Sequence, residues 1–117
     1  MMSLPKDGKF VGINVTPNYV ERGKTIEWSF QIEGTDVANH GGEYEYTTDN
    51  YYMCCYKAML KGLQFVCKNK LARNVIIKCN TLEPFKNGAL SYENESRFAN
   101  ILQFIKDNDL MVDYKEV

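Results

Sequence analysis

The chain has 117 residues, of which 44% are hydrophobic and 13% aromatic, so it suits one globular core and is too short for two. Its net charge of -1 and pI near 5.8 exclude a global positive charge that would attract nucleic acid or an anionic membrane. No signal sequence is recognisable, and no run approaches the roughly 18 apolar residues of a membrane helix. We expect a soluble, cytoplasmic protein with an N-terminal tail over residues 1–8 and a single domain over residues 9–117.

The first third of the chain predicts three strands. Residues 9–16 form a β-branched apolar run that is predicted to end in a turn at Pro17. Residues 25–33 show the period-two alternation of a half-buried strand, with apolar side chains at Ile26, Trp28, Phe30 and Ile32. Residues 34–42 are rich in turn formers, and residues 43–47 alternate again, as the return strand of a hairpin does.

A long amphipathic helix is predicted over residues 51–68. Thr48, Asp49 and Asn50 form an N-cap cluster before it, and its polar face carries Lys57, Lys61, Gln64 and Lys68. The following run, residues 75–80, is continuously apolar at its start, which is typical of a central parallel strand covered on both faces.

A second helix and a closing strand complete the pattern. Phe98, Ile101, Leu102 and Ile105 have the i, i+3, i+4, i+7 spacing of an amphipathic helix that ends near Asn108. Residues 110–117 can form a last strand. Leu63, Ile101 and Leu102 lie on the apolar faces of the two predicted helices, so we expect their side chains to be buried.

Four cysteines and one histidine restrict the possible metal chemistry. Cys54 and Cys55 are adjacent, whereas Cys67 and Cys79 are isolated, so no CxxC pair or disulfide framework is present. His40 lies in Asn-His-Gly-Gly, which is typical of a turn. These patterns predict buried free thiols and no zinc site.

The element order β-β-β-α-β-α-β resembles that of the ribonuclease H-like superfamily over residues 9–117. Residues 48–50 and 54–63 look like the family's Thr-Asn-Asn turn and Ala-Glu-Tyr-x-Ala-Leu-x-x-Gly-Leu helix. Residues 75–81 look like its strand ending in Asp-Ser, and residues 13–16 like its strand ending in Asp-Gly-Ser. The resemblance implies an α/β fold with a mixed five-stranded sheet, three antiparallel strands first, then α-β-α-β, with the helices packed on the sheet.

The resemblance also implies where a catalytic centre belongs. In the family, Asp on the first strand, Glu on the first helix and Asp at the end of the strand after it bind two divalent cations, which activate water. Here these positions are Asn14, Cys55 and Asn80. A neutral amide or thiol compensates little of the charge of Mg²⁺. We therefore expect no intact catalytic site, no metal and no cofactor.

Two functions remain open at this point. The first is a catalytically inactive domain that serves as a protein- or nucleic-acid-interaction module, with the partner and the oligomeric state undetermined. The second is a divergent nuclease that binds Mg²⁺ or Mn²⁺ through displaced carboxylates, for which Glu43, Glu45 and Asp49 are the nearby candidates.

Local charge offers a candidate nucleic-acid surface. Residues 50–82 contain no acidic residue but six basic ones: Lys57, Lys61, Lys68, Lys70, Arg73 and Lys78. Three of them, Lys57, Lys61 and Lys68, lie roughly 200 to 240° around the helix from Cys55, so they point away from that position and a solvated helix face is the favoured explanation. Four tyrosines can either stack on bases or pack in the core: Tyr44, Tyr46, Tyr51 and Tyr52.

Overall fold

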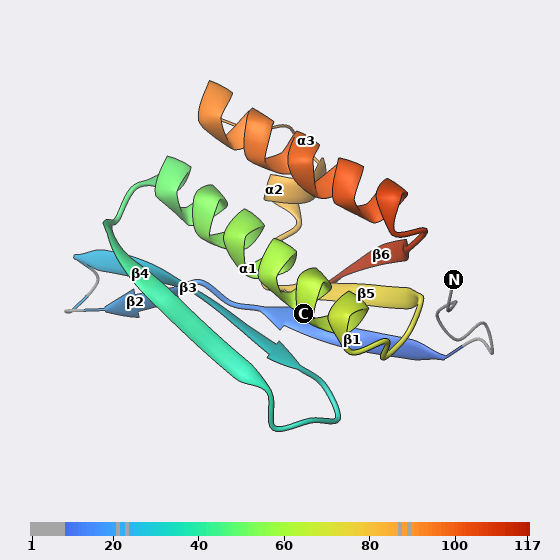
Figure 1. Cartoon of the computed structure of the whole chain (residues 1–117). Helices are drawn as coiled ribbons and strands as arrows, with labels where there is room; N and C mark the ends of the chain where they lie inside the picture. Colours follow the sequence, from blue (N-terminus) through green and yellow to red (C-terminus); the bar gives the residue numbers. More distant parts are fainter. Residues whose placement is uncertain (1–8, 21, 23, 87, 89) are drawn as a thin grey trace.

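In the computed structural model, residues 9–117 are described except for residues 21, 23, 87 and 89, and the predicted tail over residues 1–8 lies outside the described part. The helices lie on one face of a twisted sheet (Figure 1). The elements, in chain order, are β1 Phe10–Val15, β2 Asn18–Val20, β3 Thr25–Ile32, β4 Ala38–Glu45, α1 Thr48–Lys68, β5 Asn74–Cys79, α2 Glu83–Lys86, α3 Tyr92–Asp107 and β6 Met111–Glu116.

The sheet is mixed, as predicted. Strand β1 pairs antiparallel with β3 and parallel with β5, and β5 pairs parallel with β6. On its other side β3 pairs antiparallel with β4. The strand containing Ile76 is therefore an inner, parallel strand, as predicted. It is parallel to the strand containing Ile13, and the Trp28 strand lies antiparallel beside the latter.

Strands β1 and β2 form one interrupted strand along β3. Ile13 lies opposite Ile32 and Tyr19 opposite Ile26, so the same number of residues separates the pairs on both strands and none is inserted. The regular strand is interrupted at residues 16–17, where the Thr16 N–H still donates to the Ser29 carbonyl at 3.0 Å. The predicted turn at Pro17 is wrong, because the chain continues straight on and reverses only after Val20.

Strand β4 begins earlier than predicted. It starts at Ala38, so His40 and the glycines that indicated a turn belong to the strand. A Cβ atom at Gly41 would lie 2.7 Å from the Trp28 ring, so glycine at this position leaves room for the indole. The small residue serves cross-strand packing here rather than a turn, which is why its sequence signal was misleading.

The core lies between the sheet and α1. Thr47 caps α1, its side chain accepting the N–H of Asn50, one residue before the predicted cap cluster. Leu63 and Ile101 are fully buried, as predicted. Leu102 is 48% exposed, and its predicted burial is wrong because it lies about 100° around α3 from Ile101. The short helix α2, in which Phe85 is buried, was not among the predicted elements.

The second face of the sheet is not covered by any helix of the described residues (Figure 1). Along β5 burial alternates, with Val75 and Ile77 fully buried and Ile76 only half-buried. The expected coverage of β5 on both faces is therefore wrong, since only alternate side chains meet the helices. We call this uncovered surface the open face. No helix in the described part is long and apolar enough to cross a membrane.

Candidate functional site at the strand ends

A polar site lies where β1 and β5 end beside the first turns of α1. The Tyr51 hydroxyl donates a hydrogen bond to Asn80 Oδ1 at 2.6 Å. Val15 lies level with Cys79 in the parallel β1–β5 pairing, so continuing the register by one residue brings Thr16 level with Asn80. We call Thr16, Tyr51 and Asn80 the strand-end site. Its three side chains are neutral hydrogen-bonding groups.

The residues expected from the sequence lie in three different places. Asn80 belongs to the strand-end site. Cys55 is fully buried one helical turn beyond Tyr51. Asn14 is level with Lys78, not Asn80, and its Nδ2 donates to Gln31 Oε1 at 2.8 Å on the open face. The structure therefore does not bring Asn14 together with the other two.

Thr16 was not found by sequence reasoning, and Tyr51 was named only among the tyrosines that can stack on bases, although each had a signal. Thr16 is the last residue before the proline that interrupts the strand. Tyr51 lies four residues before Cys55 and so shares its helix face, with its ring packed against the core and its hydroxyl reaching the strand end. The alignment of β1 with β5 decides which residue is level with Asn80.

Burial keeps the Tyr51 phenol of the strand-end site neutral. Burial is the main cause that raises the pKa of Tyr51, and the neighbouring Cys55 adds to it, so the phenol stays protonated and can donate to Asn80. Contact with the Cys79 thiol raises the pKa of Cys55. The same contact, helped by backbone N–H groups of Asn80 and Thr81, lowers the pKa of Cys79 to about 7.

The acidic candidates for displaced metal ligands do not converge on this site. Asp49 Oδ1 accepts a hydrogen bond from Asn94 Nδ2 at 3.0 Å, which directs it toward α3. Glu43 and Glu45 alternate along β4 with Tyr44, whose ring packs against the core, so they point to the opposite face. Within the described residues, no group of three or more His, Cys, Asp or Glu side chains could hold a metal ion.

An exposed aromatic pair lies next to the strand-end site. The rings of Tyr19 and Tyr46 have centroids 5.0 Å apart, and their hydroxyls are 3.3 Å apart. Tyr19 is close enough to Tyr51 to contribute to raising its pKa. Of the other tyrosines that the sequence singled out, Tyr52 is buried and Tyr44 packs against the core.

The six basic residues do not form one surface. Lys78 Nζ contacts Glu33 Oε1 at 2.8 Å on the open face, and Arg73 contacts Asp109 at 3.0 Å near the start of β5. Lys61 lies over the Trp28 ring, 4.8 Å from its centroid. Lys68 and Lys70 are at the carboxyl end of α1.

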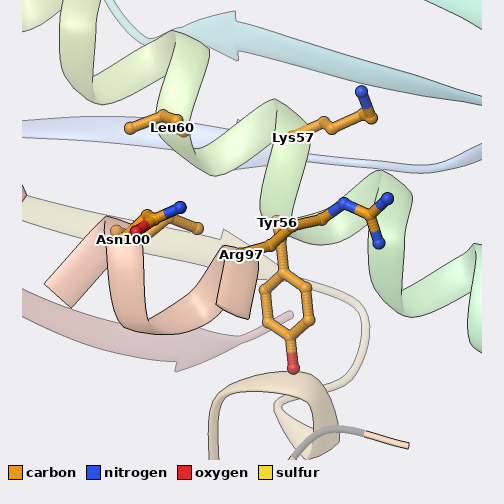
Figure 2. Close-up of a pocket in the computed structure, with 6 residues that line it drawn as sticks. Tyr56, Lys57, Leu60, Arg97 and Asn100 are labelled. Carbon is orange, nitrogen blue, oxygen red and sulfur yellow. The ribbon is translucent and has the colours of Figure 1, made fainter. Parts of the chain in front are cut away.

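The sixth basic residue, Lys57, lines a shallow hollow of about 90 Å³ between α1 and α3. In Figure 2 the Lys57 and Arg97 side chains extend from the two helices in the same direction, and Leu60 lies farther along the hollow. The Tyr56 ring points away from them, and its hydroxyl donates to the Pro84 carbonyl at 2.6 Å.

Solved structures of ribonucleases H share this architecture. The N-terminal ribonuclease H domain of Rv2228c from Mycobacterium tuberculosis, solved as a fusion with maltose-binding protein, matches with a TM-score of 0.65 and 13% identity over 93% of this chain and 87% of that one. LC11-RNase H1, in complex with an RNA/DNA hybrid, gives 0.67 and 15% over 92% and 84%. RNase H1 from the archaeon Halobacterium salinarum NRC-1 gives 0.61 and 8% over 92% and 86%.

The chain therefore has a ribonuclease H-like fold, and the resemblance in element order is confirmed at this level. Identities of 8–15% establish the fold alone. No protein-family profile matches the sequence, and no curated protein matches it significantly.

Proposed function

We propose that this chain is a catalytically inactive ribonuclease H-like domain that binds nucleic acid without cleaving it. The neutral strand-end site carries the proposal. Two-metal nucleases of this superfamily need carboxylates from the first strand, the first helix and the end of the strand that follows it. Thr16, Tyr51 and Asn80 supply a hydroxyl, a phenol and an amide there, which offer Mg²⁺ no anionic ligand.

The exposed tyrosines support nucleic acid as the partner. Aromatic rings bind single bases by stacking, and the ring pair of Tyr19 and Tyr46 lies beside hydrogen-bonding groups of the strand-end site. LC11-RNase H1, which has the same fold, was solved with an RNA/DNA hybrid.

A protein partner is the second candidate, favoured by the charge distribution. Lys78 and Arg73 already contact carboxylates, so the basic segment offers less positive charge to a phosphate backbone than its sequence indicates.

A cleavage assay and a metal-site rescue test the catalytic part. The unmodified chain is expected to leave the RNA strand of an RNA/DNA hybrid intact in Mg²⁺ and in Mn²⁺. The triple variant Thr16→Asp, Tyr51→Glu, Asn80→Asp is expected to bind Mn²⁺, seen as NMR line broadening at the strand ends. The matched control replaces Thr16→Asp by Asn14→Asp, which has the same net charge but places one carboxylate level with Lys78 instead of Asn80, and is expected to bind Mn²⁺ weakly.

Two results would change the proposed function. Metal-dependent cleavage by the unmodified chain, abolished by Asp49→Asn or Glu45→Gln, would make it a nuclease with displaced ligands. For the partner, Tyr19→Ala and Tyr46→Ala are expected to weaken binding of labelled single-stranded and hybrid oligonucleotides, whereas Tyr92→Ala on the exposed side of α3 is not. Absence of oligonucleotide binding would favour a protein partner.

A further inference from the structure

Strand β6 leaves one row of backbone groups unpaired at the sheet edge. The Met111 N–H donates to the Arg73 carbonyl and the Val117 N–H to the Cys79 carbonyl, both at 3.0 Å. Because successive residues of a strand direct their backbone groups to opposite sides, Asp113 and Lys115 also face β5. The N–H and C=O groups of Val112, Tyr114 and Glu116 therefore face the free edge, where no strand of the described residues pairs with them.

The side chains of β6 alternate between the two faces of the sheet. Val112 and Tyr114 turn toward the helices and pack against the core, and the Tyr114 ring stacks on Phe85 with centroids 5.3 Å apart. The open face receives four exposed side chains in the order apolar, acidic, basic, apolar: Met111, Asp113, Lys115 and Val117. The two apolar ones are 60% and 69% exposed, respectively.

We propose that β6 pairs antiparallel with β6 of a second copy of this chain, about a two-fold axis at Tyr114. Two residues can exchange backbone hydrogen bonds only if both direct their N–H and C=O groups to the free edge. The two-fold axis must therefore lie at a residue and not midway between two consecutive residues. With the axis at Tyr114, Asp113 lies opposite Lys115 of the partner subunit, and Met111 lies opposite Val117 of the partner subunit. Both pairs occur twice.

The neighbouring registers are disfavoured by charge. An axis one residue earlier places Asp113 opposite the partner's Asp113, and an axis one residue later places Lys115 opposite the partner's Lys115. Like charges directly opposite each other destabilise a strand pair, whereas opposite charges and apolar pairs stabilise it. Backbone hydrogen bonds thus supply the affinity of the contact, and the order of charges on β6 selects its register.

Such an edge contact is smaller than the interfaces of permanent dimers, so the dimer is in exchange with the monomer and depends on concentration. The inference does not depend on the proposed function, because it uses neither the strand-end site nor the tyrosine pair. The dimer joins two sheets into one, with the helices of both copies on the same face.

Charge reversal on the 117-residue chain tests the register. Sedimentation velocity is expected to show a mass that rises with concentration above 13.5 kDa. Asp113→Lys and Lys115→Asp, alone, are each expected to raise the dissociation constant about tenfold or more, because like charges then face each other. An equimolar mixture of the two variants is expected to regain dimers, since every lysine of one then faces an aspartate of the other.

The controls make the same charge changes on exposed residues away from the edge. Asp36→Lys in the β3–β4 connection and Lys106→Asp on α3 are expected to leave the dissociation constant unchanged. Hydrogen exchange supplies a second readout, because the amides of Val112, Tyr114 and Glu116 are expected to gain protection as the concentration rises, while those of Asp113 and Lys115 keep theirs.

Three results would overturn the proposal. The first is a monomer at every concentration reached. The second is a dimer that Asp113→Lys and Lys115→Asp leave intact. The third is a mixture of these two variants that remains monomeric.

Discussion

At the residue scale, Gly12 lets an ion pair cross the central strand of the sheet. Glu33 follows β3 and Lys78 lies on β5, so the pair at 2.8 Å passes over β1 between them. A Cβ atom at Gly12 would overlap the Glu33 carboxylate, which explains glycine in the middle of a strand. The contact with Lys78 is the main cause that lowers the pKa of Glu33, and Asn14 and Lys115 lower it further.

The lowered pKa predicts a pH-dependent contribution of Glu33 to stability. The unfolded chain binds a proton at Glu33 more readily than the folded one, so the contribution is fully present above the ordinary glutamate pKa and is lost as the pH falls through the lowered pKa of the folded state. Glu33→Gln is therefore expected to be less stable than the unmodified chain at neutral pH and to approach it in acid. Urea unfolding at a series of pH values measures this.

Glu43→Gln, an exposed substitution on β4, is the control, and its effect on the free energy of unfolding is expected to be small. A stability difference for Glu33→Gln that is the same at neutral and at acidic pH would mean that the contact with Lys78 does not stabilise the fold.

At the element scale, the sequence predicts elements whose pattern is periodic and misses those formed by pairing. The alternation in β3 and the spacing in α1 and α3 are local, so these elements were found. Strand β2 and the start of β4 depend on where β3 runs, and their Pro17 and Gly41 have the local signature of turns. The strand-end site was only partly found for the same reason, since the β1–β5 register places Thr16, and not Asn14, level with Asn80.

Two leucines on the predicted apolar helix faces are expected to differ in their contribution to stability. Leu63 on α1 is fully buried, so Leu63→Ala is expected to cost about 2–5 kcal/mol of unfolding free energy through lost burial and a cavity. Leu102 on α3 is 48% exposed, so Leu102→Ala is expected to change it by less than about 0.5 kcal/mol. Urea unfolding of both variants measures the difference. If both substitutions lowered the unfolding free energy equally, the Leu102 side chain would have to make a buried contact that this structure lacks.

At the scale of the whole molecule, the charges are balanced and dispersed. The net charge is -1. The basic residues of segment 50–82 lie in several places: on the open face, near the start of β5, at the end of α1 and between α1 and α3. The strand-end site itself is neutral. Binding at this site is therefore expected to rely on stacking and hydrogen bonds more than on the release of counterions.

This distribution predicts a weak salt dependence of nucleic-acid binding. Each neutralised phosphate contributes about -0.7 to -0.9 to the slope of log K against log salt, and we expect a slope corresponding to at most about two phosphates. Fluorescence anisotropy of a labelled oligonucleotide at increasing KCl measures it. A steep slope that Lys57→Glu and Lys61→Glu reduce would instead indicate a basic surface along α1.

The interruption at Pro17 divides the first strand of the sheet into a fixed part and a part that can open. Strand β1 is anchored between β3 and β5 with Ile13 and Val15 fully buried, whereas β2 pairs with β3 alone and has no buried residue. Because β2 pairs with a single neighbour and buries none of its residues, it can detach from β3 at a lower free energy than global unfolding. Tyr19 moves with it. The aromatic pair thus joins Tyr19 on a segment that can open to Tyr46 outside it. Its rings can separate around a ligand while the core stays closed.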